Sequence, residues 1–326
     1  MPAGRVLVLL LLAATVLYVG SDRLLRNSTA FWRFCARYSN STHGRPLEIE
    51  ASLALLEPGT LDLAVLGDSI AQSDLSVPRL AQGLGMATDR VLDLHLPAGS
   101  PVELAMMAPE LVRALPRVVV LLAPVWILYE TTEADDMRFY SPSMAPRLFS
   151  TREILADHTA HVSNALASTH VVVRHRDRLR RAIGAAATGR SPDSDLPDDL
   201  AHSPNAQPEA AAPSIGRRQP ICPNPQTRAI AVLAERLQAR GTSFTVVSTP
   251  SLDERGHRPF LLDTLDACLA SMAAESGFLH IPSTEFHQPE AGEFSDPSHM
   301  NLVGRMRFTD ELTRRIAPTL PPPDGG

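Results

Sequence analysis

A serine near the start of the chain stands where nucleophilic catalysis could occur. Ser69 lies in the triplet Gly67-Asp68-Ser69, between a short apolar run and a segment of helix length. A serine at such a strand-to-helix turn projects its hydroxyl beside helix N-terminal amides, which have no intrahelical partner and favour developing negative charge. Taken alone, the triplet is more typical of an ordinary turn in which Asp68 or Ser69 caps a helix. A catalytic interpretation therefore needs a base.

A base and its partner occur together near the C-terminus, in the segment FSDPSHMNLVG. Asp296 and His299 are three residues apart, just before a segment of helical periodicity. In a tight turn, this spacing lets Asp296 orient one imidazole nitrogen while the other faces a hydroxyl. A serine needs such a base, because its hydroxyl is a poor nucleophile until the proton is removed. The alternative is that Asp296 and Pro297 begin the helix and His299 is surface polar. A serine at a strand end makes the catalytic interpretation the stronger one.

Composition excludes several other kinds of chemistry. All 30 Lys+Arg residues are arginines. Without lysine there is no pyridoxal phosphate or other Schiff base, no Walker A loop and no Ser-x-x-Lys site. A net charge of −6 and 5% aromatic residues disfavour nucleic acid as a partner. The three cysteines, Cys35, Cys222 and Cys268, have no metal-type spacing and allow at most one disulfide. We expect no structural metal and no cofactor.

The N-terminus has the pattern of a targeting segment. After Arg5, residues Val6 to Gly20 form an almost unbroken apolar run, which polar and basic residues follow. The run is short for a transmembrane helix, but it has the basic start and apolar middle of a secretory signal. Because no clean cleavage site follows, residues 1–26 predict an uncleaved signal anchor with the body outside the cytoplasm. A cleaved signal and a secreted protein remain the alternative.

The body alternates short apolar runs with helix-length segments. The predicted strands are 61–66, 91–94, 118–123, 244–248 and 278–281. The predicted helices are about 71–85, 101–115, 227–240, 260–276 and 302–316. This alternation predicts an α/β domain over 61–326, with a parallel sheet covered on both faces and reacting groups at the carboxyl ends of the strands. Residues 27–60 would be a membrane-proximal connector.

An insertion at 150–226 interrupts the alternation. Residues 150–187 predict helices between the third and fourth strands. Residues 188–226 are rich in Pro, Ser, Asp and Ala and predict a flexible loop. A lid over the site and a tolerated insertion are about equally compatible with this pattern.

Two polar patterns inside the insertion are ambiguous. Asp157, His158 and His161 could suggest a metal site, but no further ligand pattern accompanies them and an exposed helix face is favoured. The arginines between 174 and 181 could grip an anionic polymer or lipid head groups, although a solvated helix face is again favoured.

Together, the GDS triplet after the first strand and D-x-x-H before the last helix resemble the SGNH (GDSL-like) hydrolase superfamily. The form DPSHMNLVG, with Asn301 and Gly304, is most similar to membrane-anchored bacterial members, such as the D-alanyl transfer protein and the alginate O-acetylation proteins. The resemblance covers about 61–316, with the insertion unmatched. It implies a flavodoxin-like three-layer α/β/α fold preceded by a transmembrane helix, in a single-pass protein of the bacterial cell membrane with its catalytic domain periplasmic or at the cell surface.

The resemblance also implies roles for individual residues. Ser69 matches the nucleophile, His299 the general base and Asp296 its orienting acid. Gly99, in HLPAGSPVE, matches a glycine whose N–H, with that of Ser69, forms the oxyanion hole. A plain turn glycine is the alternative for Gly99.

The sequence departs from the family after the third strand. Many members carry an oxyanion-hole asparagine there, whereas this chain has Pro124, Val125 and Trp126. The departure disfavours a broad-specificity esterase. The implied function is an extracytoplasmic serine acyl-ester hydrolase or O-acyltransferase that acts on a cell-surface glycan through an acyl-enzyme, with a membrane-bound O-acyltransferase as a partner. The alternative is a catalytically inactive protein of the same fold that binds or assembles polysaccharide.

Overall fold

The chain folds around a five-stranded parallel sheet. The computed structural model describes residues 3–39, 44–128, 137–189, 220–252, 258–296 and 298–320, with side chains from residue 12 onward. The strands are β1 (Leu63–Gly67), β2 (Val91–His95), β3 (Val118–Ala123), β4 (Ser243–Ser248) and β5 (Leu279–Ile281), in the order β2-β1-β3-β4-β5. This is the flavodoxin-like order, and the direction of winding reverses between β1 and β3. The predicted α/β class and parallel sheet are confirmed.

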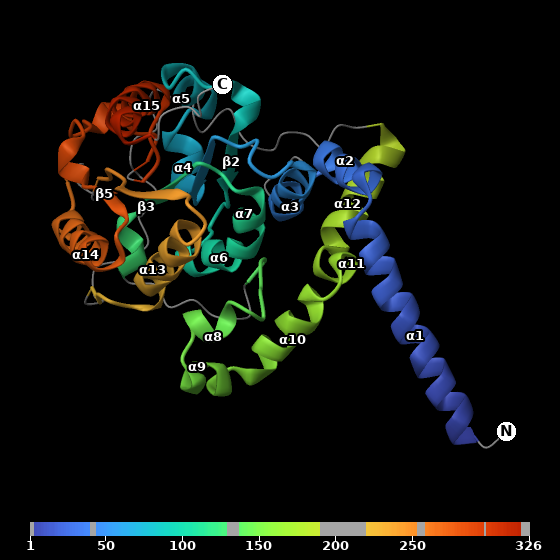
Figure 1. The fold of residues 1–326 in the computed structure, drawn as a ribbon. Helices are drawn as coiled ribbons and strands as arrows, with labels where there is room; N and C mark the ends of the chain where they lie inside the picture. The colour runs from blue at the N-terminus through green and yellow to red at the C-terminus, as the bar shows by residue number, and fades with distance from the viewer. Residues whose placement is uncertain are drawn as a thin grey trace.

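Helices cover both faces of the sheet (Figure 1). One core cluster packs beneath α6 (Pro101–Met106), α7 (Ala108–Ala114), α13 (Pro225–Gln238) and α14 (Leu261–Ser276). The other packs beneath α4 (Ser69–Asp74), α5 (Val77–Gly83) and α15 (Leu302–Ile316). All residues of β1 and β3 are buried, as expected for strands enclosed by helices on both sides.

Two predicted helices are each divided in two. The segment 71–85 forms α4 and α5, and 101–115 forms α6 and α7. Pro78 and Pro109 stand in the first turn of α5 and α7, respectively. Because proline has no N–H and clashes with the preceding turn, a helix restarts at each of these positions.

Helices outside the sheet layers lie at the N-terminus and in the insertion. The N-terminal ones are α1 (Ala3–Arg26), α2 (Thr29–Tyr38) and α3 (Arg45–Leu55). Helices α2 and α3 lie in the segment 27–60, for which the sequence predicted only a connector. Those between β3 and β4 are α8 (Ala145–Leu148), α9 (Thr151–Ala156), α10 (His158–Ser168), α11 (Val171–Arg174) and α12 (Arg176–Thr188). Residues 190–219, most of the predicted loop, lie outside the described residues.

Helix α1 projects away from the sheet, with its C-terminal end against α11 and α2 (Figure 1). In the part of the chain that the structure describes, no helix is long and apolar enough to cross a membrane. The signal anchor at 1–26 therefore stays a prediction.

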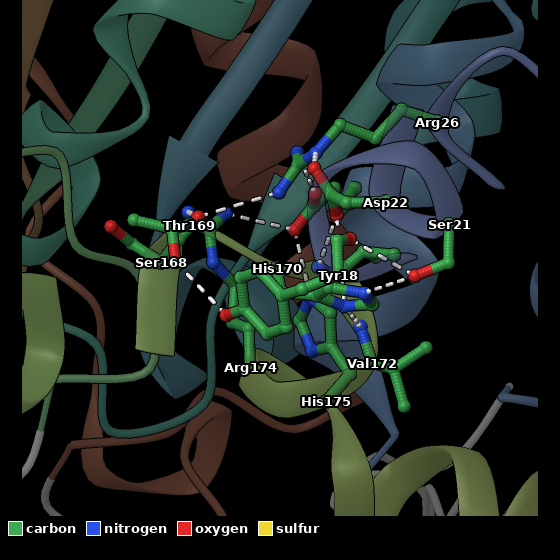
Figure 2. Close-up of polar contacts among 12 residues, drawn as sticks. Tyr18, Ser21, Asp22, Arg26, Ser168, Thr169, His170, Val172, Arg174 and His175 are labelled. Carbon is green, nitrogen blue, oxygen red and sulfur yellow. Dashed lines mark hydrogen bonds and ion pairs between the residues drawn. The ribbon is translucent and has the colours of Figure 1, made fainter. Parts of the chain in front are cut away.

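A buried group of charges, the Glu50 cluster (Asp22, Arg26, Glu50, Arg174 and His175), holds α1, α3 and α11 together. Glu50 is 4% exposed and accepts hydrogen bonds from His175 Nε2 at 2.7 Å and from Arg174 at 3.1 Å. Arg26 reaches Glu50 at 3.4 Å and Asp22 at 2.6 Å, and Asp22 accepts the Val171 N–H at 2.7 Å (Figure 2). One carboxylate thereby links three segments that are distant in the sequence.

Neutral polar side chains extend this junction along α1 (Figure 2). His170 Nδ1 accepts the Val172 N–H, so Nε2 carries the ring proton and donates to Ser21 Oγ at 3.1 Å. The Ser21 hydroxyl in turn donates to the Tyr18 carbonyl. Tyr18 packs on the His170 ring and bonds Thr169 Oγ1 at 3.0 Å. Hydrogen-bond donation therefore runs from the Val172 N–H through His170 and Ser21 to the Tyr18 carbonyl.

The environment of Glu50 makes the junction sensitive to acid. Burial alone would raise the pKa of Glu50, but the hydrogen bond from His175 and the charges of Arg174, His175 and Arg26 lower it from 4.5 to about 2. A carboxyl group with a depressed folded-state pKa stabilises the fold above its unfolded pKa. That stabilisation is lost as the pH falls from 4.5 toward 2.

We predict that Glu50→Ala lowers the free energy of unfolding by about 3–5 kcal/mol at neutral pH, because it leaves the Arg174 guanidinium without its buried counter-charge. Urea denaturation measures this loss. Asp310→Ala is the control, since it breaks the ion pair with Arg79 at the surface and should cost much less. Equal losses in the two variants would contradict the account, as would a Glu50→Ala effect that does not shrink in acid.

One disulfide ties the chain just before α13 to α14. Cys222 and Cys268 are bonded, with their Cα atoms 6.1 Å apart, and Cys35 is free and buried. The bond joins the residues just before α13 to α14 across a sequence separation of 46.

We predict that Cys222→Ser/Cys268→Ser loses up to about 4 kcal/mol of stability, because the unfolded chain is then less constrained. Dithiothreitol should lower the melting temperature of the wild type alone; an equal shift in the double variant would contradict this.

Candidate active site

Ser69 is the first residue of α4, directly after β1 and at the switch point of the sheet. The preceding residue, Asp68, is the helix cap: its Oδ1 accepts the Ile70 N–H at 2.9 Å. The cap interpretation of the triplet is therefore correct for Asp68, while Ser69 keeps its hydroxyl for another partner. Gly67 is required here, because a Cβ on it would lie 2.3 Å from the Ala71 Cβ.

His299 lies on a short hairpin-like loop before α15. Phe294 and Met300 form an antiparallel bridge, and the Ser295 N–H donates to the His299 carbonyl at 2.8 Å. The N-cap of α15 is Asn301, whose side chain accepts the N–H groups of Val303 and Gly304. The alternative in which Asp296 begins this helix is therefore wrong. Pro297 lies outside the described residues.

The three predicted catalytic side chains form one hydrogen-bonded chain. His299 Nε2 lies 3.1 Å from Ser69 Oγ, and His299 Nδ1 lies 2.8 Å from Asp296 Oδ2. The other oxygen of Asp296 accepts the N–H groups of Ser298 and His299, at 2.8 and 2.9 Å. These bonds fix the carboxylate so that it selects the imidazole tautomer with a proton on Nδ1. Nε2 is then free to accept the Ser69 proton.

The electrostatics of the site suit a general base. Burial alone would lower the pKa of His299, but the hydrogen bond and charge of Asp296, with contributions from Asp74 and Asp68, raise it above 6.5. Burial opposes ionisation of Asp296, yet the hydrogen bond and charge of His299 hold its pKa below 3.8. Asp296 therefore stays ionised and stabilises the imidazolium that forms when Ser69 loses its proton.

The structure gives Gly99 a different hydrogen bond from the one predicted. Its N–H donates to the Leu96 carbonyl at 2.6 Å, in a turn where Ala98 has a φ of 53°. In this conformation, the Gly99 amide does not face an oxyanion, so its predicted role would require the turn to open. The Ser69 N–H, at the start of α4, belongs to the first helical amides, which have no intrahelical acceptor.

The turn that contains Gly99 is tied to the chain that leads into the insertion. Arg138 donates to the Pro97 carbonyl at 2.5 Å and pairs with buried Glu103 at 2.7 Å. The Arg138 N–H also donates to Glu103, at 2.5 Å. These bonds hold the turn against the chain that follows β3.

Trp126 is a site residue for which sequence reasoning found no role. It follows β3, and its Nε1–H donates to Asp68 Oδ2 at 2.8 Å. Burial raises the pKa of Asp68, which the bonds from Trp126 and Ile70 oppose. Trp126 thus fixes the residue before Ser69. The only sequence feature that indicates a site role for Trp126 is its position at the end of a predicted strand.

The two ambiguous patterns of the insertion prove largely structural. His161 is 5% exposed and bonds the Tyr140 hydroxyl at 3.0 Å, so the predicted exposed face is wrong for this residue. Arg174 belongs to the Glu50 cluster, whereas the side chain of Arg176 is 79% exposed. Within the described ranges, no group of three or more His, Cys, Asp or Glu side chains could hold a metal ion.

A cavity of about 670 Å³ lies away from the three catalytic candidates. It is beside β5 and the C-terminal part of α15, where Phe286, Glu311 and Arg315 are among its lining residues. None of Ser69, Asp296 and His299 lines it. The side chains of His299 and Asp296 are instead 24% and 30% exposed, so the site is open to solvent at the sheet edge.

Comparisons with known proteins add little to this geometry. No family model matches the sequence, and no curated protein matches it. Among solved structures, the chain is similar to TesA, with 12% identity and a TM-score of 0.40 over 79% of this chain and 99% of that one. A similarity this distant carries no inference about chemistry.

We predict that Asp296→Asn lowers kcat by about 10³–10⁴-fold in any serine-dependent turnover, because the imidazole loses its orienting acceptor. The wild-type kcat/KM should fall in acid, with an apparent pKa above 6.5, since protonated His299 cannot accept a proton. In Asp296→Asn, the fall of kcat/KM in acid should move to lower pH. A fall that stays in place would contradict the assignment of His299 as the base.

Proposed function

We propose that this chain is a serine acyl-ester hydrolase or O-acyltransferase. The observation that supports the proposal is the hydrogen-bonded chain Ser69–His299–Asp296, with Ser69 at a helix N-terminus. A nucleophile beside a base, which is itself oriented by a third group, is the arrangement that serine catalysis requires.

In each half of the mechanism, His299 takes one proton and passes it on. His299 Nε2 takes the proton of the Ser69 hydroxyl while Oγ bonds the acyl carbonyl carbon. The resulting oxyanion lies beside the first amide of α4, where the helix dipole favours negative charge. His299 then gives the proton to the departing alcohol, and an acyl-enzyme remains on Ser69. Water or a sugar hydroxyl then attacks the acyl carbon while His299 Nε2 takes its proton. The bond from the acyl carbon to Ser69 Oγ breaks, His299 returns the proton to Oγ, and the acyl group leaves on the attacking oxygen. These steps use no metal or organic cofactor.

The proposed substrate is a cell-surface glycan outside the cytoplasm, which loses an acyl group in hydrolysis or gains one in transfer. The apolar run at 6–20 and the disulfide between Cys222 and Cys268 support the location, and the motif resemblance supports the glycan. Disulfides persist mainly in oxidising compartments. We propose that residues 1–26 anchor the chain in a bacterial membrane, where a membrane-bound O-acyltransferase would supply the acyl donor.

A second candidate is a non-catalytic polysaccharide-binding or assembly protein with the same fold. Two observations favour it: the Gly99 N–H is bonded to Leu96, and Trp126 stands where relatives carry an oxyanion-hole asparagine. This candidate predicts glycan binding that Ser69→Ala and His299→Gln leave unchanged.

A fluorophosphonate probe on the purified chain separates the two candidates. We predict covalent labelling of Ser69 in the wild type and in Ser143→Ala, an exposed control serine, and its absence in Ser69→Ala. His299→Gln should lower the labelling rate by at least about 10²-fold, because the hydroxyl loses its base. No labelling of the wild type, or equal labelling of Ser69→Ala, would overturn the enzymatic proposal.

An activated acetyl ester, offered with and without an oligosaccharide acceptor, then separates hydrolysis from transfer. Transfer predicts acetylated oligosaccharide and less free acetate when the acceptor is present. Acetate release that the acceptor does not change would support hydrolysis alone.

A further inference from the structure

Asp74 joins the helix of the nucleophile to the loop of the base. It is the last residue of α4, five positions after Ser69, and is 0% exposed. Its Oδ1 accepts the N–H of Met300, the residue after His299, at 2.7 Å, and the Ser73 hydroxyl at 2.6 Å. A single buried oxygen therefore connects the two parts of the candidate site.

Other bonds between these segments lie farther along α15. The Ser76 N–H donates to Thr309 Oγ1 at 3.0 Å, and Arg305 donates to the Leu75 carbonyl at 2.9 Å. Both hold the body of α15 against the chain after α4. Only the Asp74 bond, among these three, acts on the residue next to His299.

The second oxygen of Asp74 takes no part in the hydrogen bonds that join the two segments. Oδ2 is buried and has no hydrogen-bond partner among the described residues. Burial of an unsatisfied carboxylate oxygen costs stability. An asparagine could accept the Met300 N–H equally well without a buried charge. The carboxylate therefore calls for a second role.

The neighbouring charges indicate what this role is. Burial raises the pKa of Asp74 to about 7, with opposing effects from Ser73, Met300 and the charge of His299, and a further small rise from Asp68. In return, the charge of Asp74 helps to raise the pKa of His299. The other titratable groups that act on this pair are Asp68, the residue before α4, and Asp296, in the His299 loop.

We propose that Asp74 is a positioning residue that fixes the His299 loop against α4 and supplies buried negative charge to stabilise the His299 imidazolium. This inference deepens the proposed function and rests on it for the kinetic effect. The charge favours the state in which His299 holds the Ser69 proton. It acts through His299, without contact to the substrate.

Asp74→Asn separates the charge from the hydrogen bond, because the amide oxygen still accepts the Met300 N–H. We predict that the pKa of His299, followed by NMR titration and assigned with His299→Gln, falls by about one unit. In hydrolysis of an activated acetyl ester, kcat should fall roughly tenfold with little change in KM, the equivalent of that shift. Thr309→Val, which removes the bond to Ser76, should lower the melting temperature and leave both readouts unchanged.

If Asp74→Asn does not fold, Ser73→Ala gives the same test in weaker form. It removes one hydrogen bond to the Asp74 carboxylate and leaves this group more protonated, so the pKa of His299 should again fall.

The NMR readout keeps this inference separate from the proposed function. An unchanged pKa of His299 in the variants would overturn the role of Asp74, even if the wild type hydrolyses esters. A wild type that neither hydrolyses nor reacts with the fluorophosphonate probe would overturn the proposed function. The titration would still decide whether Asp74 controls His299.

Discussion

The hydrogen bond between Ser69 and His299 joins residues 230 positions apart, and the rest of the fold makes this contact possible. β1 lies beside β3, at the point where the winding of the sheet reverses, so α4 begins at the edge where ligands bind in such folds. α15 packs on the same face of the sheet as α4 and α5. Its preceding loop therefore reaches Ser69. Asn301 ends that loop and starts the helix, and Asp74 binds the loop to α4.

Buried charge is used twice in this chain, with different consequences. In the Glu50 cluster, one carboxylate has two arginines and a histidine as partners, and its pKa is lowered. Such a site stabilises the attachment of α1 and α11. Beside His299, Asp74 has one unsatisfied oxygen and a raised pKa. The fully paired carboxylate of Glu50 favours stability, whereas the incompletely paired carboxylate of Asp74 leaves a charge that can act on a neighbouring base.

The sheet could be predicted because enclosed parallel strands are short, apolar runs between helices. The meeting of Ser69, His299 and Asp296 could be predicted from two local motifs. Asp296 and His299 are close in sequence, and Ser69 stands at a strand end. The roles of Trp126 and Asp74 could not, because each depends on a contact between distant segments. The turn at Gly99 could not either: its N–H is bonded to Leu96, which a motif does not reveal. The breaks at Pro78 and Pro109 follow from the sequence itself, because proline interrupts a helix interior.

The most direct test of the central claim is to trap the acyl-enzyme. The wild-type chain would be mixed with an activated acetyl ester, quenched in acid within one turnover and digested for mass spectrometry. We predict one acetyl group on Ser69 in the wild type, its accumulation in Asp74→Asn if deacylation slows, and none in Ser69→Ala. A wild-type chain without acetyl on Ser69, or acetylated equally on other serines, would contradict serine catalysis at this site.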